Sequence, residues 1–349
     1  MRAAASQAFR PPRWLRGGHR QTVVGHWLRR FTRWPLPCLD LTVDAGEGVR
    51  LLLRASWQPG PRERHPALVV VHGLGGSDAS SYAVSVGRLA FARGWHVLRM
   101  NMRGSGDGEA LCPLLYNAGL DTDLLAVVDE VARRVPALAV VGFSLGANLA
   151  LLMLGRLRGA LPHGLVAAVA VSPPVDLAAC ADAVERPANR LYQHRFMGML
   201  RDAYHRRHRA RPDLFPAGLE RGLHTVRQYD ERITAPFGGY VNAADYYARA
   251  SAGPWLAHVD RPTLLLAAED DPMIPAASVT RWPLSAAVAR EITSTGGHVG
   301  FVGPTPAPGW FWAAERAMAF LQERLNDTQS RCRRDGDERN RQPTTGQRG

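Results

Sequence analysis

Lysine is absent from this sequence of 349 residues, and its absence excludes several classes of enzyme. A P-loop nucleotide site, Schiff-base chemistry and the SxxK type of hydrolase all depend on a lysine amine. The net charge of +12 therefore comes from arginine alone. We attribute this composition to the coding habits of a GC-rich genome rather than to a phosphate-binding surface.

Cysteines and long apolar runs are also scarce. The four cysteines, Cys38, Cys112, Cys180 and Cys332, are far apart and form no CxxC pair, which argues against a zinc site or a disulfide framework and favours buried free thiols. No apolar run approaches the roughly 20 residues that cross a bilayer, and the basic start has no apolar signal region. These features predict a cytoplasmic globular protein that needs neither a metal nor an organic cofactor.

The arginines gather in two stretches. The first has no acidic residue before Asp40 and contains Arg10, Arg13, Arg16, Arg20, Arg29, Arg30 and Arg33, with Trp14, Trp27, Phe31 and Trp34 among them. The second contains Arg195, Arg201, Arg206, Arg207, Arg209 and Arg211. Such basic aromatic faces suit peripheral contact with an anionic membrane, although a merely solvated basic face explains them as well. Nucleic-acid motifs are lacking, so no nucleic-acid partner is expected.

Short apolar runs alternate with amphipathic segments from about residue 66 onward. Strands are predicted at 67–71, 95–102, 137–143, 165–172, 262–268 and 287–295, and helices at 79–93, 119–134, 145–158 and near 309–325. The stretch 41–54 resembles an antiparallel hairpin at a sheet edge. This alternation predicts an α/β fold with a mostly parallel central sheet covered by helices on both faces.

The same pattern suggests the division of the chain. Residues 1–40 form a basic extension that packs on the core, and 41–325 form the α/β domain. The long interruption at about 174–258 reads as an inserted helical cap, and the apolar-poor segment 326–349 is predicted to be disordered. Apolar cap residues at helical spacing either line an acyl channel or simply pack the cap on the sheet; they are Phe196, Met197, Met199, Leu200 and Tyr204.

The segment GFSLG at 142–146 matches the G-x-S-x-G pattern of a nucleophile elbow. A predicted strand runs directly into it and a predicted helix follows it, which is the context that makes this short motif specific. Side chains at Gly142 and Gly146 would clash with the sharp turn that exposes Ser144. Ser144 is therefore the candidate nucleophile, at the N-terminus of a helix that favours developing negative charge.

The segment HGLGG at 72–76 follows the first buried strand, where this kind of site places an oxyanion donor. The backbone N–H groups of Leu74 and Leu145 would form the oxyanion hole. His72 lies inside the turn and precedes the nucleophile in the chain. We interpret it as a structural histidine that bonds the loop backbone.

The acid and the base are expected after late strands, in the order serine, acid, histidine. Asp271 follows the fifth predicted strand and is the preferred acid, with Asp270 as the alternative. His298 follows the sixth strand and a pair of glycines, which let the loop approach the serine. His298 would take the Ser144 proton, and Asp271 would orient the imidazole and stabilise its cation.

Several further segments match the blocks of one known family. They are 9–15 (FRPPRWL), 19–22 (HRQT), 101–106, 116–124, 142–148, 228–240 and 245–251. Over roughly residues 9–325 the sequence resembles the YheT-like branch of the α/β-hydrolases. This resemblance implies hydrolysis of carboxylic esters with Ser144, Asp271 and His298 as the triad. The substrates of the family range from short acyl esters to glycerolipids, so the resemblance leaves the head group and acyl length open.

Three hypotheses follow. The first is an esterase that acts on a small-molecule or lipid acyl ester. The second is a hydrolase-fold protein that binds a ligand without turnover, against which the complete set of site residues argues. The third is a membrane-binding protein that uses its basic opening segment, which is also compatible with a lipase acting on a lipid ester.

Overall fold

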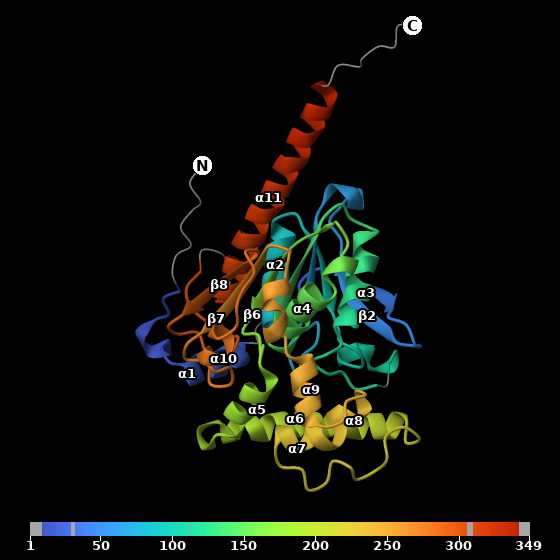
Figure 1. Cartoon of the computed structure of the whole chain (residues 1–349), viewed down its shortest axis with the longest axis vertical. Helices are drawn as coiled ribbons and strands as arrows, with labels where there is room; N and C mark the ends of the chain where they lie inside the picture. The colour runs from blue at the N-terminus through green and yellow to red at the C-terminus, as the bar shows by residue number, and fades with distance from the viewer. Residues whose placement is uncertain (1–8, 29–31, 113, 306–309, 342–349) are drawn as a thin grey trace.

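The computed structural model describes residues 9–28, 32–112, 114–305 and 310–341, with only the backbone of residues 331–341. An eight-stranded sheet forms its centre, in the order β1-β2-β4-β3-β5-β6-β7-β8 (Figure 1). The strands are β1 (Leu39–Asp44), β2 (Arg50–Ser56), β3 (Ala67–Val71), β4 (His96–Met100), β5 (Leu138–Phe143), β6 (Leu165–Val171), β7 (Thr263–Ala268) and β8 (Val288–Thr293). Strands β1 and β2 form the predicted antiparallel edge hairpin, and β3 to β8 pair in parallel. The predicted fold class is therefore confirmed.

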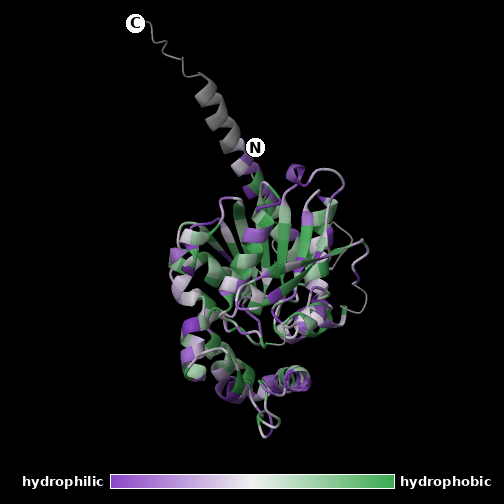
Figure 2. Ribbon diagram, turned by 90° about the vertical axis from the view of Figure 1, so that its right-hand side faces the viewer, coloured by the Kyte–Doolittle hydropathy of each residue, from purple (hydrophilic) through white to green (hydrophobic). Residues whose placement is uncertain are grey.

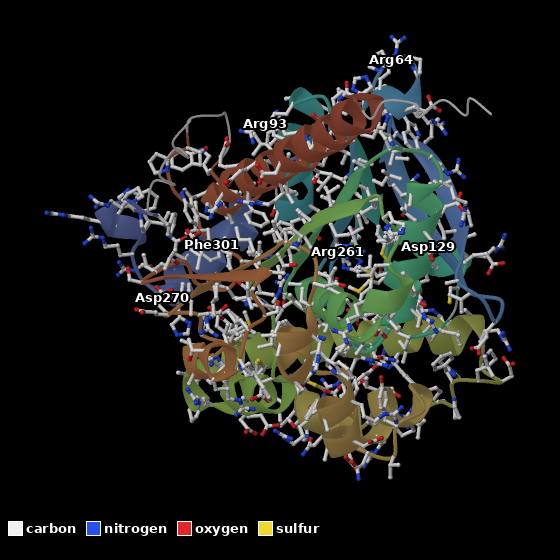
Figure 3. The ribbon with its side chains drawn as sticks, turned by 45° about the horizontal axis from the view of Figure 1, so that its top comes forward. Arg64, Arg93, Asp129, Arg261, Asp270 and Phe301 are labelled. Atoms are coloured by element: carbon white, nitrogen blue, oxygen red, sulfur yellow. The ribbon has the colours of Figure 1, made fainter. Side chains whose placement is uncertain are left out.

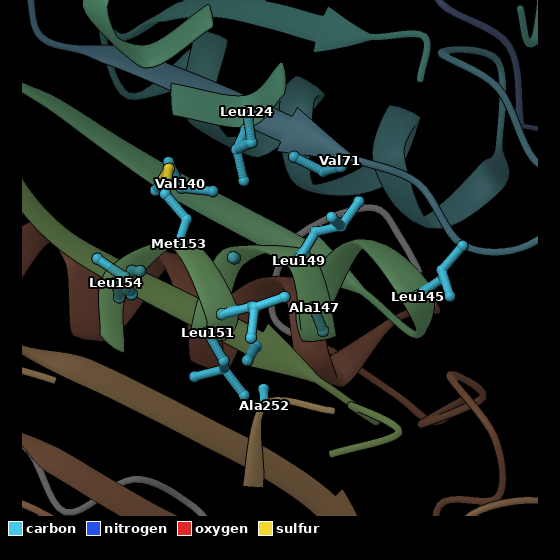
Figure 4. Packing of buried hydrophobic residues seen from close by; sticks show 14 of the residues in the cluster. Val71, Leu124, Val140, Leu145, Ala147, Leu149, Leu151, Met153, Leu154 and Ala252 are labelled. Atoms are coloured by element: carbon cyan, nitrogen blue, oxygen red, sulfur yellow. The ribbon is translucent and has the colours of Figure 1, made fainter. Parts of the chain in front are cut away.

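Helices cover both faces of the sheet. Helices α2 (Ser81–Ala92) and α11 (Trp312–Arg341) pack on one face, and α3 (Asp121–Ala132) and α4 (Leu145–Arg156) pack on the other. Side chains alternate along each strand, so Val69 faces α4 while Leu68 faces α2. The central strands β3 and β6 are buried on both faces and consist of apolar residues alone, whereas the equally buried β4 also contains His96 and Arg99. The sheet is accordingly mostly in the hydrophobic colour in Figure 2. Figure 4 shows the α4 side of this core, with Leu145 at the start of the helix.

The cap lies between β6 and β7, below the sheet in Figure 1. It contains α5 (Leu177–Glu185), α6 (Arg190–Ala210), α7 (Val226–Tyr229), a π-helical turn (Asp230–Thr234), α8 (Ala235–Phe237) and α9 (Ala243–Ala250). Side chains at the helix starts cap α5, α7 and α9, through Asp176, Thr225 and Asn242. The cap has a small core of its own, made of Met197, Tyr204, Phe215, Leu223, Tyr229 and Ile233. Met197 and Tyr204 thus pack inside the cap, and the channel interpretation is wrong for these two residues.

Short helices complete the described chain. They are α1 (Gly18–Trp27), α10 (Ala276–Thr280) and the 3₁₀ turns Arg13–Leu15, Arg62–Arg64, Gly106–Ala110, Arg158–Ala160, Pro187–Asn189 and Gly253–His258. The N-terminal segment packs on the end of the sheet, where the ring of Phe9 lies 5.7 Å from that of Phe301. Among the described helices, none is both long and apolar enough to cross a membrane.

Helix α11 differs from the predicted disordered tail. The helix continues past residue 325 to Arg341, and residues 342–349 lie outside the described chain. Its extension has few apolar residues, but Gln322 bonds Asn326 at 3.1 Å and Arg324 pairs with Asp327 at 3.0 Å. Side-chain pairs at these spacings support a helix without an apolar face. The structure thus continues the helix over residues 326–341, beyond the predicted end of the α/β domain at residue 325.

Two other predictions need correction. Cys112 and Cys180 are buried free thiols as predicted, but Cys38 is exposed, and the side chain of Cys332 lies outside the described part. In the second arginine stretch, Arg207 is buried rather than solvated and pairs with Glu109 at 2.6 Å. Of the first stretch, Arg29, Arg30 and Phe31 lie outside the described residues.

Candidate active site

Ser144 occupies a sharp turn between β5 and α4. Its backbone has φ 50° and ψ −119°, a conformation that L-residues rarely adopt and that costs about 1–3 kcal/mol. A Cβ at position 142 would lie 2.3 Å from the carbonyl oxygen of Gly146, and a Cβ at position 146 would lie 2.5 Å from that of His72. Glycine is thus required at Gly142 and Gly146 because backbone atoms occupy the space on both sides of the serine.

The three residues predicted for the triad lie in one hydrogen-bonded line. His298 Nε2 lies 2.8 Å from Ser144 Oγ, and His298 Nδ1 lies 2.9 Å from Asp271 Oδ2. The other oxygen of Asp271 accepts the backbone N–H groups of Met273 and Ile274, at 2.9 and 3.0 Å. The Asp271 side chain is almost completely buried, so both of its oxygens are fixed in place.

The alternative acid, Asp270, has a different set of partners. Its Oδ1 accepts the N–H groups of Gly296 and Gly297, both at 2.9 Å, and its Oδ2 accepts the hydroxyl of Thr295 at 2.7 Å. Asp270 thus anchors the loop that carries His298, while Asp271 contacts the ring itself. The geometry favours Asp271 over Asp270 as the orienting acid.

His72 has the structural role expected of it. The ring is fully buried, with Nδ1 2.8 Å from the carbonyl oxygen of Gly73. An N–H at Nδ1 leaves Nε2 as an acceptor, and Nε2 lies 3.2 Å from the backbone N of Met102 and 2.9 Å from Ser105 Oγ. His72 holds the loop backbone together and lies outside the line of Ser144, Asp271 and His298.

Two tyrosines fix the loop that contains Leu74. The N–H of Gly73 donates to Tyr82 Oη at 3.0 Å, and the N–H of Gly75 donates to Tyr116 Oη at 2.7 Å. Burial raises the pKa of Tyr116 to about 12, so this acceptor stays neutral. Within the described chain, the N–H groups of Leu74 and Leu145 donate to no other residue, and both residues line a cavity with Ser144.

Two cavities meet at Ser144 and His298. The first, of about 130 Å³, lies under the cap and is mostly apolar, with Leu177, Val184, Phe196, Leu200, Val226 and Ile274 in its wall. The second, of about 370 Å³, lies between α1 and α6 and is lined in part by Val23, Tyr82, Leu191, Tyr192 and Met199. Of the suggested channel residues, Phe196 and Leu200 line the first cavity and Met199 lines the second.

Asp230 is a polar residue in the wall of the first cavity that the sequence analysis did not single out. Its carboxylate accepts the hydroxyl of Tyr247 at 2.7 Å, and burial raises the pKa of Asp230 to about 6. The one indication of Asp230 in the sequence was its position within 228–240, a segment that matches a block of the resembling family. It opens the π-helical turn, a feature frequent at functional sites.

Asp230→Asn should change the pH dependence of stability. The folded protein keeps the Asp230 proton up to about pH 6, whereas an unfolded carboxyl loses it near 3.8. The resulting stabilisation is complete below 3.8 and is lost as the pH rises through 6. Asparagine cannot ionise, so between pH 4 and 8 the free energy of unfolding of the variant should rise relative to wild type by on the order of 3 kcal/mol. Urea unfolding at both pH values checks this, and parallel profiles would contradict it.

Comparison with known families agrees with the fold. A family model described as the alpha/beta hydrolase fold matches residues 66–304. The chain belongs to this family. Within it, the chain is 32% identical to YheT of Escherichia coli (strain K12), which is named as an esterase, over 91% of this chain and 94% of YheT. This likeness confirms the resemblance to the YheT-like branch.

More distant relatives carry lipid-related names. The monoacylglycerol lipase of Saccharomyces cerevisiae is 31% identical over 74% of this chain, and the mouse phospholipase ABHD3 is 30% identical over 68%. The chain spans 59% and 58% of the lengths of these two proteins. Among solved structures, the Pyrococcus furiosus esterase Pf2001 has a TM-score of 0.53 at 17% identity, covering 82% of this chain and 92% of its own. At that identity the similarity concerns the fold alone.

Proposed function

We propose that this protein is a serine hydrolase that cleaves carboxylic esters through an acyl-enzyme intermediate. The observation that carries the proposal is the bridging position of His298, at 2.8 Å from Ser144 Oγ and 2.9 Å from Asp271 Oδ2. The candidate base is thus within hydrogen-bond reach of both the nucleophile and the orienting acid. The names of the esterase and lipase relatives point to the same reaction class.

The residues would act in sequence. Ser144 Oγ attacks the ester carbonyl while His298 Nε2 takes its proton, and Asp271 stabilises the imidazolium. The N–H groups of Leu74 and Leu145 bind the oxyanion of the tetrahedral intermediate. His298 then gives its proton to the departing alcohol, which leaves the acyl group on Ser144. A water molecule, deprotonated by His298 Nε2, then attacks the acyl carbon. The bond between that carbon and Ser144 Oγ breaks, the carboxylic acid leaves, and His298 returns the proton to Oγ.

The two cavities suggest how an ester would bind. An apolar acyl group fits the cavity under the cap, and the alcohol portion fits the cavity between α1 and α6. Among the described residues, there is no group of three or more His, Cys, Asp or Glu side chains that could hold a metal ion. The proposed chemistry uses side chains and backbone N–H groups without a metal or organic cofactor.

The test is turnover of p-nitrophenyl esters from acetate to palmitate, combined with labelling by a fluorophosphonate. We expect turnover of at least one ester and loss of activity as one equivalent of label attaches to Ser144, located by mass spectrometry of the peptide. Label on another residue would contradict the site. A folded protein with neither turnover nor labelling would support the alternative of binding without catalysis.

Esters presented at a membrane are a second candidate substrate. Val23 and Leu191 line the second cavity and are 51% and 69% exposed, so two apolar side chains at this cavity face the solvent. Arg195 lines the same cavity, and Arg20 is exposed on α1. Apolar side chains beside arginines suit the interface of an anionic bilayer.

A paired substitution tests this membrane contact. Val23→Asp with Leu191→Asp should weaken binding to phosphatidylcholine vesicles containing phosphatidylserine by roughly tenfold or more, because two apolar side chains would no longer enter the interface. Flotation with the vesicles at low and high salt measures it. Val241→Asp is the control, since Val241 is 84% exposed but lines neither cavity. Equal binding by all three proteins would rule out this surface.

A further inference from the structure

The buried face of α1 is made of small and polar residues. Gly18, Gln21 and Gly25 are buried and Thr22 is half-buried, while the aromatic Trp27 is exposed. These positions recur every three to four residues and therefore share one face of the helix. That face lies against Asp270 and the loop 296–302, which carries His298. Figure 3 shows Asp270 and Phe301 beside this N-terminal part of the chain.

The helix and the loop approach so closely that side chains are excluded. A Cβ on Gly18 would lie 1.7 Å from the carbonyl oxygen of Asp270, and a Cβ on Gly300 would lie 2.6 Å from that of Gln21. The closest neighbours are backbone atoms, which cannot move away as a flexible side chain could. The two segments therefore form one rigid contact.

Gln21 fixes the end of the histidine loop. Its side chain is fully buried; Nε2 donates to the carbonyl oxygens of Leu15 and Val302, both at 3.0 Å, and Oε1 accepts the N–H of Val302 at 2.7 Å. Both polar atoms of the amide are thus paired. A buried amide with three bonds holds its partners strongly, because breaking any one leaves an unpaired polar group.

Thr22 contacts the backbone of the histidine itself. Its hydroxyl donates to the carbonyl oxygen of Gly18 at 2.7 Å and accepts the backbone N–H of His298 at 2.8 Å. The single hydroxyl proton is engaged by Gly18, so the N–H of His298 must be the donor in the second bond. Thr22 thereby fixes the point from which the imidazole extends.

The backbone of the loop that carries His298 is strained. Gly297, Val299 and Phe301 have φ values of 57°, 55° and 42°, in the left-handed region. For the branched Val299 and the bulky Phe301 this conformation is unfavourable, by about 1–3 kcal/mol each. A strained loop persists only where neighbouring residues hold it, and here Asp270 and α1 provide those bonds.

We propose that Gln21 and Thr22 are positioning residues, which hold the His298 loop so that Nε2 stays within hydrogen-bond reach of Ser144 Oγ. The inference rests on the proposed function, since it assigns to the HRQT segment a part in the same reaction. Neither residue contacts the reacting atoms. Thr22 also lines the second cavity, but its hydroxyl is engaged by Gly18 and His298, so the chemical step should respond to its loss more than substrate binding does.

The test compares Thr22→Val, which removes the hydroxyl, with Thr22→Ser, which keeps it. We expect Thr22→Val to lower kcat for p-nitrophenyl acetate by about 10- to 100-fold, the loss expected from a small misplacement of a catalytic group, with little change in KM. Thr22→Ser should restore most of the rate. Thr32→Val is the matched control, because Thr32 Oγ1 also donates to a backbone carbonyl, that of Leu28 at 3.2 Å, away from the site.

Two further readouts separate positioning from general damage. The rate of fluorophosphonate labelling should fall with kcat in Thr22→Val, and the downfield proton NMR signal of the His298–Asp271 hydrogen bond should broaden or vanish there but persist in Thr22→Ser. Wild-type kcat in Thr22→Val, or equal losses in Thr22→Val and Thr32→Val, would overturn the proposal. Failure of the proposed function would look different, because the wild-type protein itself would then show neither turnover nor labelling.

Discussion

Ser144→Ala should reduce kcat for ester hydrolysis by about 10⁴- to 10⁶-fold, the largest effect expected of any single substitution in this protein. The variant lacks the oxygen that would form the acyl-enzyme. The remaining reaction would be direct attack by water on an ester carbonyl bound at the oxyanion donors. Folding should be preserved, because alanine is smaller than serine and occupies the same turn. Turnover of the best ester, together with the thermal unfolding temperature, measures both expectations.

Ser330→Ala is a suitable control for this substitution. Ser330 lies exposed on α11, where its hydroxyl donates to the carbonyl oxygen of Asn326 at 2.8 Å. It should keep wild-type turnover and labelling. Residual activity in Ser144→Ala within tenfold of wild type would remove Ser144 from the reaction and, with it, the proposed acyl-enzyme.

Asp271→Asn should lower kcat by about 10⁴-fold, whereas Asp270→Asn should have a much smaller effect. Asp271 Oδ1 accepts two backbone N–H groups, so an asparagine at 271 would keep its carbonyl oxygen there and turn its NH₂ group toward His298 Nδ1. The imidazole would then have to accept at Nδ1 and carry its proton on Nε2. In that tautomer it cannot take the proton of Ser144.

Asparagine at position 270 retains most of the bonds present now. Its carbonyl oxygen can accept the N–H groups of Gly296 and Gly297, and its NH₂ group can donate to the hydroxyl of Thr295. Measurement of kcat/KM against pH for both variants decides between the two carboxylates. A larger loss in Asp270→Asn than in Asp271→Asn would reverse the assignment of the acid.

The parts of the site that the sequence predicted are those with strong local signals. A side chain at position 142 or 146 would collide with backbone atoms, so the two glycines are required by the turn. The G-x-S-x-G pattern therefore points to Ser144 from the sequence alone. The acid and the base follow β7 and β8 because parallel strands bring their carboxyl ends to one edge. The sequence prediction of His298 rested on its position after a late strand, the order of the residues along the chain and the preceding glycine pair, and the same reasoning narrowed the acid to Asp270 and Asp271.

The parts that could not be predicted depend on contacts between distant segments. The inward face of α1 has glycine, glutamine and threonine, so it lacks the apolar periodicity that reveals a buried helix. Asp230 resembles any surface carboxylate in the sequence, and it becomes buried only when the cap that contains it folds. Met197 and Phe196 are adjacent and both apolar, yet one packs inside the cap and the other faces the cavity, which only the position of α6 decides.

The contact between Thr22 and His298 joins residues 276 positions apart in the chain. During synthesis, α1 leaves the ribosome long before β8 and the loop that it supports exist. The nucleophile turn can form early from neighbouring segments, but the base can reach its place only after nearly the whole chain has emerged. An incompletely synthesised polypeptide would thus lack the proposed activity, because Ser144 would gain its hydrogen bond to His298 at one of the last steps of folding.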